Sequence, residues 1–185
     1  MAQSKILVDT NCYLRLAQSI HPLLFSPFGQ NEYCLYVIPE LNVELQGHHL
    51  RSKFPWIDQS EFVEGRKHFP TVSRKQKKSI EETFDFLWDY VESELPGPSR
   101  VDARFVAYAL ELQIPLVTDD EDMIQLAKAF GAAVMRSLDL LKLMLDEGHV
   151  DMKKIEAIVA YWRHIGDTPG RLTERYRQVF GAKPP

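Results

Sequence analysis

In "KILVDTN", residues 5–11, a short apolar run ends on an acid, a hydroxyl and an amide. Continuous apolar residues that include the β-branched Ile6 and Val8 are typical of a buried strand. Asp9 directly follows this strand, so we expect its carboxylate at the carboxyl edge of a sheet. Open α/β sheets bind their ligands beyond that edge.

Strand and helix patterns alternate along the rest of the chain. Further strands are predicted at "YCLYVIP" (33–39), "IPLVTDD" (114–120) and "AAVMRS" (132–137). Helical spacing predicts helices over 12–20, 40–54, 100–113 and 121–131, with one or two more within 60–95. This alternation predicts an α/β fold with a parallel sheet that carries helices on both faces.

The length sets the domain organisation. A chain of 185 residues with 45% hydrophobic content can bury one core and carry an appendage. We expect a domain over residues 1–148 and a helical C-terminal extension over 149–185, with helices in 151–166 and 167–181. The extension either packs on the domain as part of the same unit or offers a docking surface through Arg171, Arg175, Tyr176 and Arg177.

Charge is unevenly distributed. The net charge of −4 indicates no partner by itself, but residues 51–78 hold eight Lys/Arg against three Asp/Glu. This block ends in "SRKQKK", and the following "SIEETFDFLWDYVESEL" holds six acids and no base. The block is either a solvated helix face or a surface that follows an RNA backbone, with these candidate contacts: Arg74, Lys75, Lys77 and Lys78.

The expected compartment is a reducing cytoplasm. Cys12 and Cys34 form no metal or redox spacing, and the first residues lack the pattern of a signal peptide. Every apolar run is shorter than the roughly 18 residues that a membrane span needs, so we expect no membrane partner. The six histidines show no zinc spacing, which disfavours zinc or histidine chemistry.

Acidic residues recur where strands end or helices begin. Asp9 follows the first strand and "TDDED" (118–122) follows the third. Asp102 lies in the first turn of a predicted helix, where the helix dipole alone favours an acid. Glu44 lies on the second predicted helix, with Glu40 as its competitor, and either could be a plain exposed side chain.

Four segments together, "ILVDTNCYLRL", "VIPELNVEL", "SRVDARFVAYALELQIPLVTDDEDM" and "FGAAVM", resemble in order and spacing the motifs of PIN-domain ribonucleases, a superfamily that includes the VapC-like toxins. The resemblance covers residues 4–145. It implies a three-layer α/β/α PIN-like fold with a central parallel sheet of four to five strands. It also assigns a role to each of these positions: Asp9 as a metal ligand, Asn11 and Thr118 as polar support, and Glu44, Asp102, Asp120 and Asp122 as further acids.

The acids suit a hard divalent cation. Mg²⁺ or Mn²⁺ takes carboxylate and water oxygens, lowers the pKa of a bound water and neutralises the leaving oxygen of a phosphodiester. We expect the catalytic acids to be Asp9, Glu44, Asp102 and Asp120. The metal ligands are expected to be Asp9, Asp102, Asp120 and Asp122. Glu44 and Asp122 would act through water or complete a second site, and one or two ions remain equally open.

The resemblance predicts a Mg²⁺- or Mn²⁺-dependent endoribonuclease, the toxin of a bacterial type II toxin–antitoxin pair. RNA would be the substrate, with a cognate antitoxin and a second copy of the chain as partners. An RNA-processing nuclease and a PIN-fold interaction module without catalysis are the alternatives, although all the acidic positions are filled. A haloacid-dehalogenase-like phosphatase is disfavoured, because Asn11 stands where its second acid is required.

Overall fold

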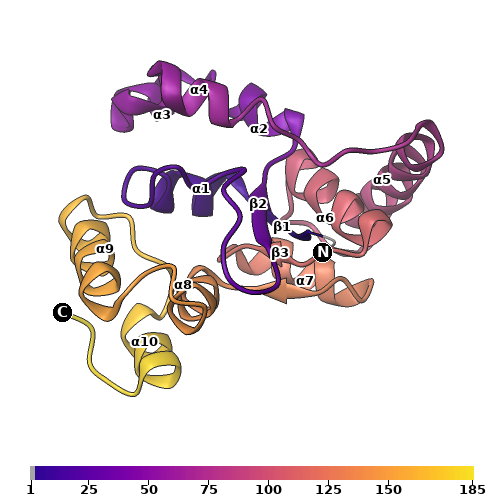
Figure 1. The fold of residues 1–185 in the computed structure, drawn as a ribbon. Coiled ribbons are helices and arrows are strands. Elements are labelled where there is room, and N and C mark those ends of the chain that lie inside the picture. The colour runs from indigo at the N-terminus through magenta and orange to yellow at the C-terminus, as the bar shows by residue number, and fades with distance from the viewer. Residues whose placement is uncertain (1–2) are drawn as a thin grey trace.

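The computed structural model describes residues 3–185, and its centre is a sheet of four parallel strands (Figure 1). The strands are β1 (Ser4–Val8), β2 (Tyr33–Tyr36), β3 (Leu116–Val117) and β4 (Val134–Met135), in the spatial order β2-β1-β3-β4. Helices flank this sheet. The predicted α/β fold is therefore confirmed, and the arrangement is consistent with three layers.

Helices connect the strands and form the C-terminal part of the chain. Those around the sheet are α1 (Thr10–Leu16), α5 (Arg74–Glu94), α6 (Arg100–Leu112), α7 (Glu121–Ala129) and α8 (Ser137–Asp146). The segment after β2 forms α2 (Pro39–Glu44), α3 (His48–Lys53), a 3₁₀ turn (Pro55–Asp58) and α4 (Ser60–Gly65). Among residues 3–185, no helix combines the length and apolar character needed to cross a membrane.

The register of the sheet brings together two segments that carry acidic and polar side chains. Val8 of β1 pairs with Val117 of β3, and the Asp9 amide continues the ladder by donating to the Val117 carbonyl at 3.0 Å. Asp9 and Thr118, the residues that directly follow these two strands, therefore lie at the same level of the sheet. This is the carboxyl edge at which an α/β sheet places its ligands.

The single helix expected over residues 40–54 is wrong, because the chain forms α2 and α3 with a turn between them. The turn falls at Gly47, whose amide donates to the Glu44 carbonyl at 3.1 Å. Glycine costs roughly 1 kcal/mol more than alanine within a helix, so a break at this position is inexpensive. Because of this turn, α2 ends at Glu44 and α3 runs in a different direction.

The C-terminal extension forms α9 (Met152–His164) and α10 (Leu172–Phe180), close to the predicted helices. Its apolar residues belong to the same hydrophobic core as the sheet, and Trp162 is fully buried. The Trp162 indole donates to the Arg15 carbonyl of α1 at 2.8 Å. Within the described residues the extension is therefore packed on the domain, while the boundary at residue 148 stays a prediction.

Candidate functional site

A cleft of about 340 Å³ opens at the carboxyl edge of the sheet. It gathers side chains from the end of β1, from α1, α2 and α3, and from the starts of α6 and α7. The lining residues are Asp9, Thr10, Asn11, Glu44, Leu50, Asp102, Phe105 and Met123. Three acids expected from the sequence to share a site therefore face one cleft, although up to 93 residues, 102 minus 9, separate them along the chain.

Asp9 is the innermost of these acids, with 1% of its surface exposed. Its Oδ1 accepts from the Cys12 amide at 2.6 Å and its Oδ2 accepts from the Thr118 hydroxyl at 2.6 Å. Burial raises the pKa of Asp9 to about 6, because removal from water penalises the charged form more than these hydrogen bonds stabilise it. Asp9 is thus a desolvated carboxylate that a cation would stabilise.

Glu44 lines the cleft from the last turn of α2. Its Oε2 accepts a hydrogen bond from the Thr10 hydroxyl. Burial raises the pKa of Glu44, and the nearby charge of Asp102 raises it further. The competing acid, Glu40, instead contacts Arg104 with 3.4 Å between the oxygen and the nitrogen, and it is not part of the cleft lining. The structure therefore brings Glu44, rather than Glu40, to the other acids.

Asp102 has both a structural and a cleft-facing role. Its Oδ2 accepts from the Ser99 amide at 2.7 Å, and its own amide donates to the Ser99 hydroxyl at 3.1 Å, which forms a capping box at the start of α6. Burial raises the pKa of Asp102, and the charges of Asp120 and Asp122 add to this effect. The capping box uses one carboxylate oxygen of Asp102, and the side chain also lines the cleft.

Asp120 and Asp122 border the cleft at the start of α7 without forming part of its lining. Asp120 caps the helix, since its Oδ1 accepts from the amides of Asp122 and Met123 at 2.9 and 3.0 Å. The Asp120 amide donates to the Thr118 hydroxyl at 3.1 Å. Because the same hydroxyl donates to Asp9, Thr118 links the Asp9 carboxylate to the backbone of Asp120. Its role as polar support of a metal site stays a prediction.

The geometry fits a hydrated cation better than one enclosed by protein. Within residues 3–185, no group of three or more Asp, Glu, His or Cys side chains lies close enough to hold one metal ion. Mg²⁺ commonly binds through one or two carboxylates and keeps several waters. Asp9, Glu44 and Asp102 line the cleft with the carboxylate oxygens that such an ion takes. Direct ligation by Asp9, Asp102 and Asp120 together stays a prediction.

Two residues at this edge were missed from the sequence. Thr10 received no role from the sequence, although its hydroxyl donates a hydrogen bond to Glu44. Asp119 received no role from the sequence, but it accepts from Arg15 Nη1 at 3.1 Å and from the Ser137 amide at 3.2 Å. Helical periodicity could not identify this contact, because Arg15 and Asp119 lie on different elements more than 100 residues apart.

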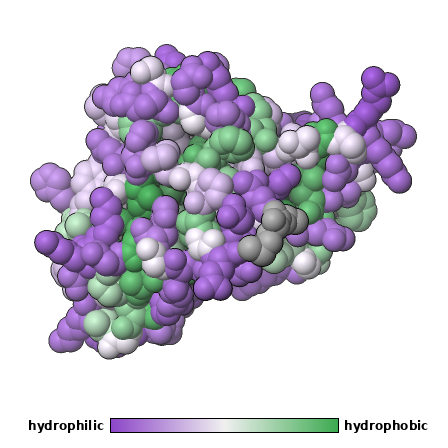
Figure 2. All heavy atoms as spheres, in the orientation of Figure 1, coloured by the Kyte–Doolittle hydropathy of each residue, from purple (hydrophilic) through white to green (hydrophobic). Residues whose placement is uncertain are grey.

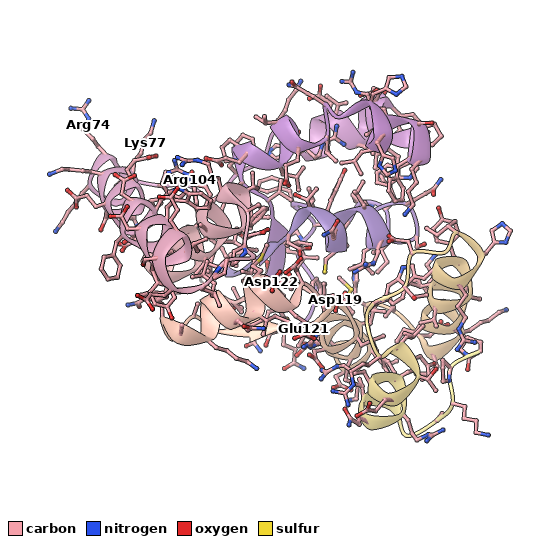
Figure 3. All side chains as sticks on the ribbon, turned by 180° about the vertical axis from the view of Figure 1, so that it is seen from behind. Arg74, Lys77, Arg104, Asp119, Glu121 and Asp122 are labelled. Carbon is pink, nitrogen blue, oxygen red and sulfur yellow. The ribbon has the colours of Figure 1, made fainter. Side chains whose placement is uncertain are left out.

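The basic residues proposed to contact RNA lie away from the acids. Figure 3 shows Arg74 and Lys77 at the outer end of α5, pointing away from Asp119 and Asp122 near the middle of the molecule. In the extension, Tyr176 is buried, so it cannot form part of an exposed docking surface.

The cleft gathers carboxylates around one open space, and its lining among the described residues contains no Lys or Arg. Asp9 and Glu44 each accept from a hydroxyl group that fixes its orientation. Burial raises the pKa of Asp9, Glu44 and Asp102, and hydrogen bonds offset only part of this effect. No family model, curated protein or solved structure matches the chain.

Proposed function

We propose that this protein is a Mg²⁺- or Mn²⁺-dependent endoribonuclease of the PIN type. The observation that carries the proposal is the meeting of Asp9, Glu44 and Asp102 in one cleft, each with a pKa raised by burial. Structural acids are normally paired with bases or left in water. Acids that are gathered, partly desolvated and not paired with bases are typical of a functional site.

Each residue has a role in this proposal. Asp9 and Asp102 would hold the ion, and Thr118 would keep Asp9 and Asp120 in register. When bound, the ion would supply an activated water and stabilise the charge on the leaving oxygen. Glu44, which lines the cleft and has a raised pKa, would accept the proton of the attacking water at Oε1, since Oε2 is bonded to Thr10.

RNA as substrate and an antitoxin as partner rest on the four sequence segments that resemble PIN-domain ribonucleases. An RNA-processing nuclease and an interaction module without catalysis remain the alternatives. A small upstream reading frame that encodes a DNA-binding protein with a disordered tail would favour the toxin. We expect the protein to act in the cytoplasm, where RNA is available to a toxin or to an RNA-processing nuclease.

The test is cleavage of single-stranded RNA by purified protein with Mn²⁺ or Mg²⁺, with and without a chelator. We expect chelation to stop cleavage, and Asp9→Asn or Asp102→Asn to lower the rate by about two decades or more, as loss of a metal ligand implies. Glu40→Gln is the matched control, because Glu40 contacts Arg104 outside the cleft lining. Cleavage that resists chelation contradicts the mechanism, and a folded protein that binds Mn²⁺ without cutting any RNA favours the interaction module.

A further inference from the structure

A second hollow, of about 200 Å³, lies beside β4, the last strand of the sheet. Three of the side chains that line it are basic: Lys128 of α7, Arg136 at the end of β4, and Arg175 of α10. Asp139 of α8 is the one acid in the lining, and the rest of the lining is apolar. In a chain whose net charge is −4, this hollow therefore gathers an excess of positive charge.

The two arginines of the hollow retain hydrogen-bond donors. Arg136 donates from Nη2 to Glu121 Oε1 at 2.7 Å, and Arg175 donates from Nη2 to Asp139 Oδ2 at 3.2 Å. A guanidinium carries five N–H donors, so these contacts leave others free. Among residues 3–185, Arg175 Nε is buried and has no hydrogen-bond partner. A buried donor without an acceptor is destabilising, so the hollow favours a ligand that brings oxygen acceptors.

The hollow and the acidic cleft lie on the same edge of the sheet. The residues that directly follow β1, β3 and β4 are Asp9, Thr118 and Arg136, and the pairing of these strands places them in one row. The Thr118 amide extends this pairing by donating to the Met135 carbonyl at 3.0 Å. Neighbouring strands are about 4.8 Å apart, so roughly 10 Å separates the backbone of Arg136 from that of Asp9. A few nucleotides of one RNA strand can therefore contact both places.

The acidic cleft needs basic residues near it if RNA is to bind. Its lining among the described residues contains no Lys or Arg, whereas proteins bind nucleic acids largely by neutralising phosphates with these side chains. The basic block at the start of α5 is remote, since Figure 2 shows strongly hydrophilic side chains that project at the upper right, where α5 begins. The hollow instead places bases beside the cleft. Arginine suits this task, because its planar fork matches the oxygens of a phosphate.

We propose that the hollow binds one phosphate of the RNA backbone while a nearby part of the same strand lies in the acidic cleft. This inference rests on the ribonuclease proposal. Arg136 and Arg175 donate to the phosphate oxygens, and Lys128 adds positive charge. Phosphate contacts fix the register of a nucleic acid on a protein, so the hollow sets which phosphodiester reaches Asp9 and Asp102. Because Arg175 belongs to α10, the C-terminal extension takes part in substrate binding.

The test is the binding of labelled single-stranded RNA in chelator, measured by fluorescence anisotropy over a series of salt concentrations. Chelator keeps binding separate from cleavage. We expect the double variant Arg136→Gln/Arg175→Gln to bind at least tenfold more weakly than wild type. The slope of log affinity against log salt concentration should become shallower by about 0.7, the value for one phosphate contact on a single strand. With Mn²⁺, KM should rise more than kcat falls, because the loss lies in binding.

The matched control is the double variant Lys142→Gln/Arg171→Gln. It removes the same charge from exposed ion pairs with Asp146 and Glu174, outside the lining of the hollow, and should bind RNA like wild type. Lys128→Glu provides a variant that changes an exposed side chain and should also weaken binding, so a double variant that fails to fold does not end the test. Melting temperatures identify the variants that fold.

Several results would overturn the proposal. One is a wild type that does not bind RNA in chelator. Another is a folded double variant, or Lys128→Glu, with the affinity and salt slope of wild type, even if wild type binds inorganic phosphate in the hollow. A control that weakens binding as much as the double variant would show an effect of net charge alone. Cleavage that resists chelation, together with weak RNA binding by the double variant, would contradict the metal mechanism and support the phosphate site.

Discussion

Asp9 and Arg66 are both buried charges, with 1% and 5% of their surfaces exposed, yet the protein treats them differently. Arg66 donates from Nε to Asn42 Oδ1 at 3.0 Å, from Nη1 to the Tyr13 hydroxyl at 3.0 Å and from Nη2 to the Ile57 carbonyl at 2.7 Å. All three acceptors are neutral. They join α2, α1 and the 3₁₀ turn around one guanidinium.

The difference shows what distinguishes a structural charge from a functional one. Arg66 has an acceptor for each of its three nitrogens, so its burial ties neighbouring elements together. Asp9 receives two hydrogen bonds, faces a cleft with other acids and has its pKa raised to about 6. The Asp9 site remains energetically unfavourable until a proton or a cation arrives, whereas Arg66 needs nothing further.

The largest effect is expected from Arg66→Met. The change leaves the Asn42, Tyr13 and Ile57 oxygens without their donor in the interior, so we expect the free energy of unfolding to fall by roughly 3 to 5 kcal/mol. Chemical denaturation measures this loss. Arg51→Met is the matched control, because its ion pair with Asp58 is exposed. Equal losses for the two variants would show that the hydrogen bonds of Arg66 are not structural.

Asp9→Asn, unlike Arg66→Met, should raise the free energy of unfolding when no metal is bound. In wild type without metal, unfolded Asp9 loses its proton near pH 3.8 and folded Asp9 near 6, so the native state binds more protons between these values. Stability therefore falls as pH rises through this window and levels off above it. The difference of about two pKa units corresponds to roughly 3 kcal/mol.

Removal of this penalty should make Asp9→Asn more stable than wild type at pH 7 in chelator, by up to that amount. The two proteins should converge near pH 4. Chemical denaturation at pH values from 4 to 8 measures the free energy of unfolding of both proteins. The difference between the two proteins isolates Asp9, because the other titratable groups are common to both. A variant that is less stable than wild type at pH 7 would show that the hydrogen bonds of Asp9 outweigh its desolvation.

Divalent metal should reverse the penalty in wild type. An ion that binds only the folded state stabilises by about 2.7 kcal/mol when its concentration is a hundred times the dissociation constant. Asp102→Asn and Glu44→Gln should gain much less from Mn²⁺, whereas Glu40→Gln should gain as much as wild type. Melting temperatures with chelator and with Mn²⁺ give the comparison. If Glu40→Gln were the only variant that gained less stability from Mn²⁺ than wild type, the metal site would contain Glu40 in place of Glu44.

The smallest effect is expected from Thr118→Val. The change removes the hydroxyl that donates to Asp9 and accepts from the Asp120 amide, which should cost about 1 to 2 kcal/mol. It also removes a hydrogen bond that lowers the pKa of Asp9, so the fall in stability with pH should move to higher pH. Thr118→Ser keeps the hydroxyl and should retain both properties. An unchanged pH midpoint in Thr118→Val would contradict the link between Thr118 and Asp9.

Local pattern was sufficient to predict the strands and most helices, because buried strands are continuous apolar runs and helices repeat their apolar residues every three to four positions. It failed at Gly47, where one residue ended a helix inside a pattern that looked continuous. The strand-end position of Asp9 followed from the same reasoning. The contacts of Thr10 with Glu44 and of Arg15 with Asp119 did not, because they depend on how distant elements pack.

The most direct test of the acidic cleft is anomalous X-ray scattering from crystals soaked in Mn²⁺. We expect a peak in the cleft between Asp9 and Asp102, within about 2.5 Å of at least one of their carboxylate oxygens. Glu44 should lie within reach of the same ion through water. Crystals of Asp102→Asn should lose the peak or show it at much lower occupancy. A wild-type cleft without a peak, in crystals that bind Mn²⁺ elsewhere, would contradict the claim that these acids form a metal site.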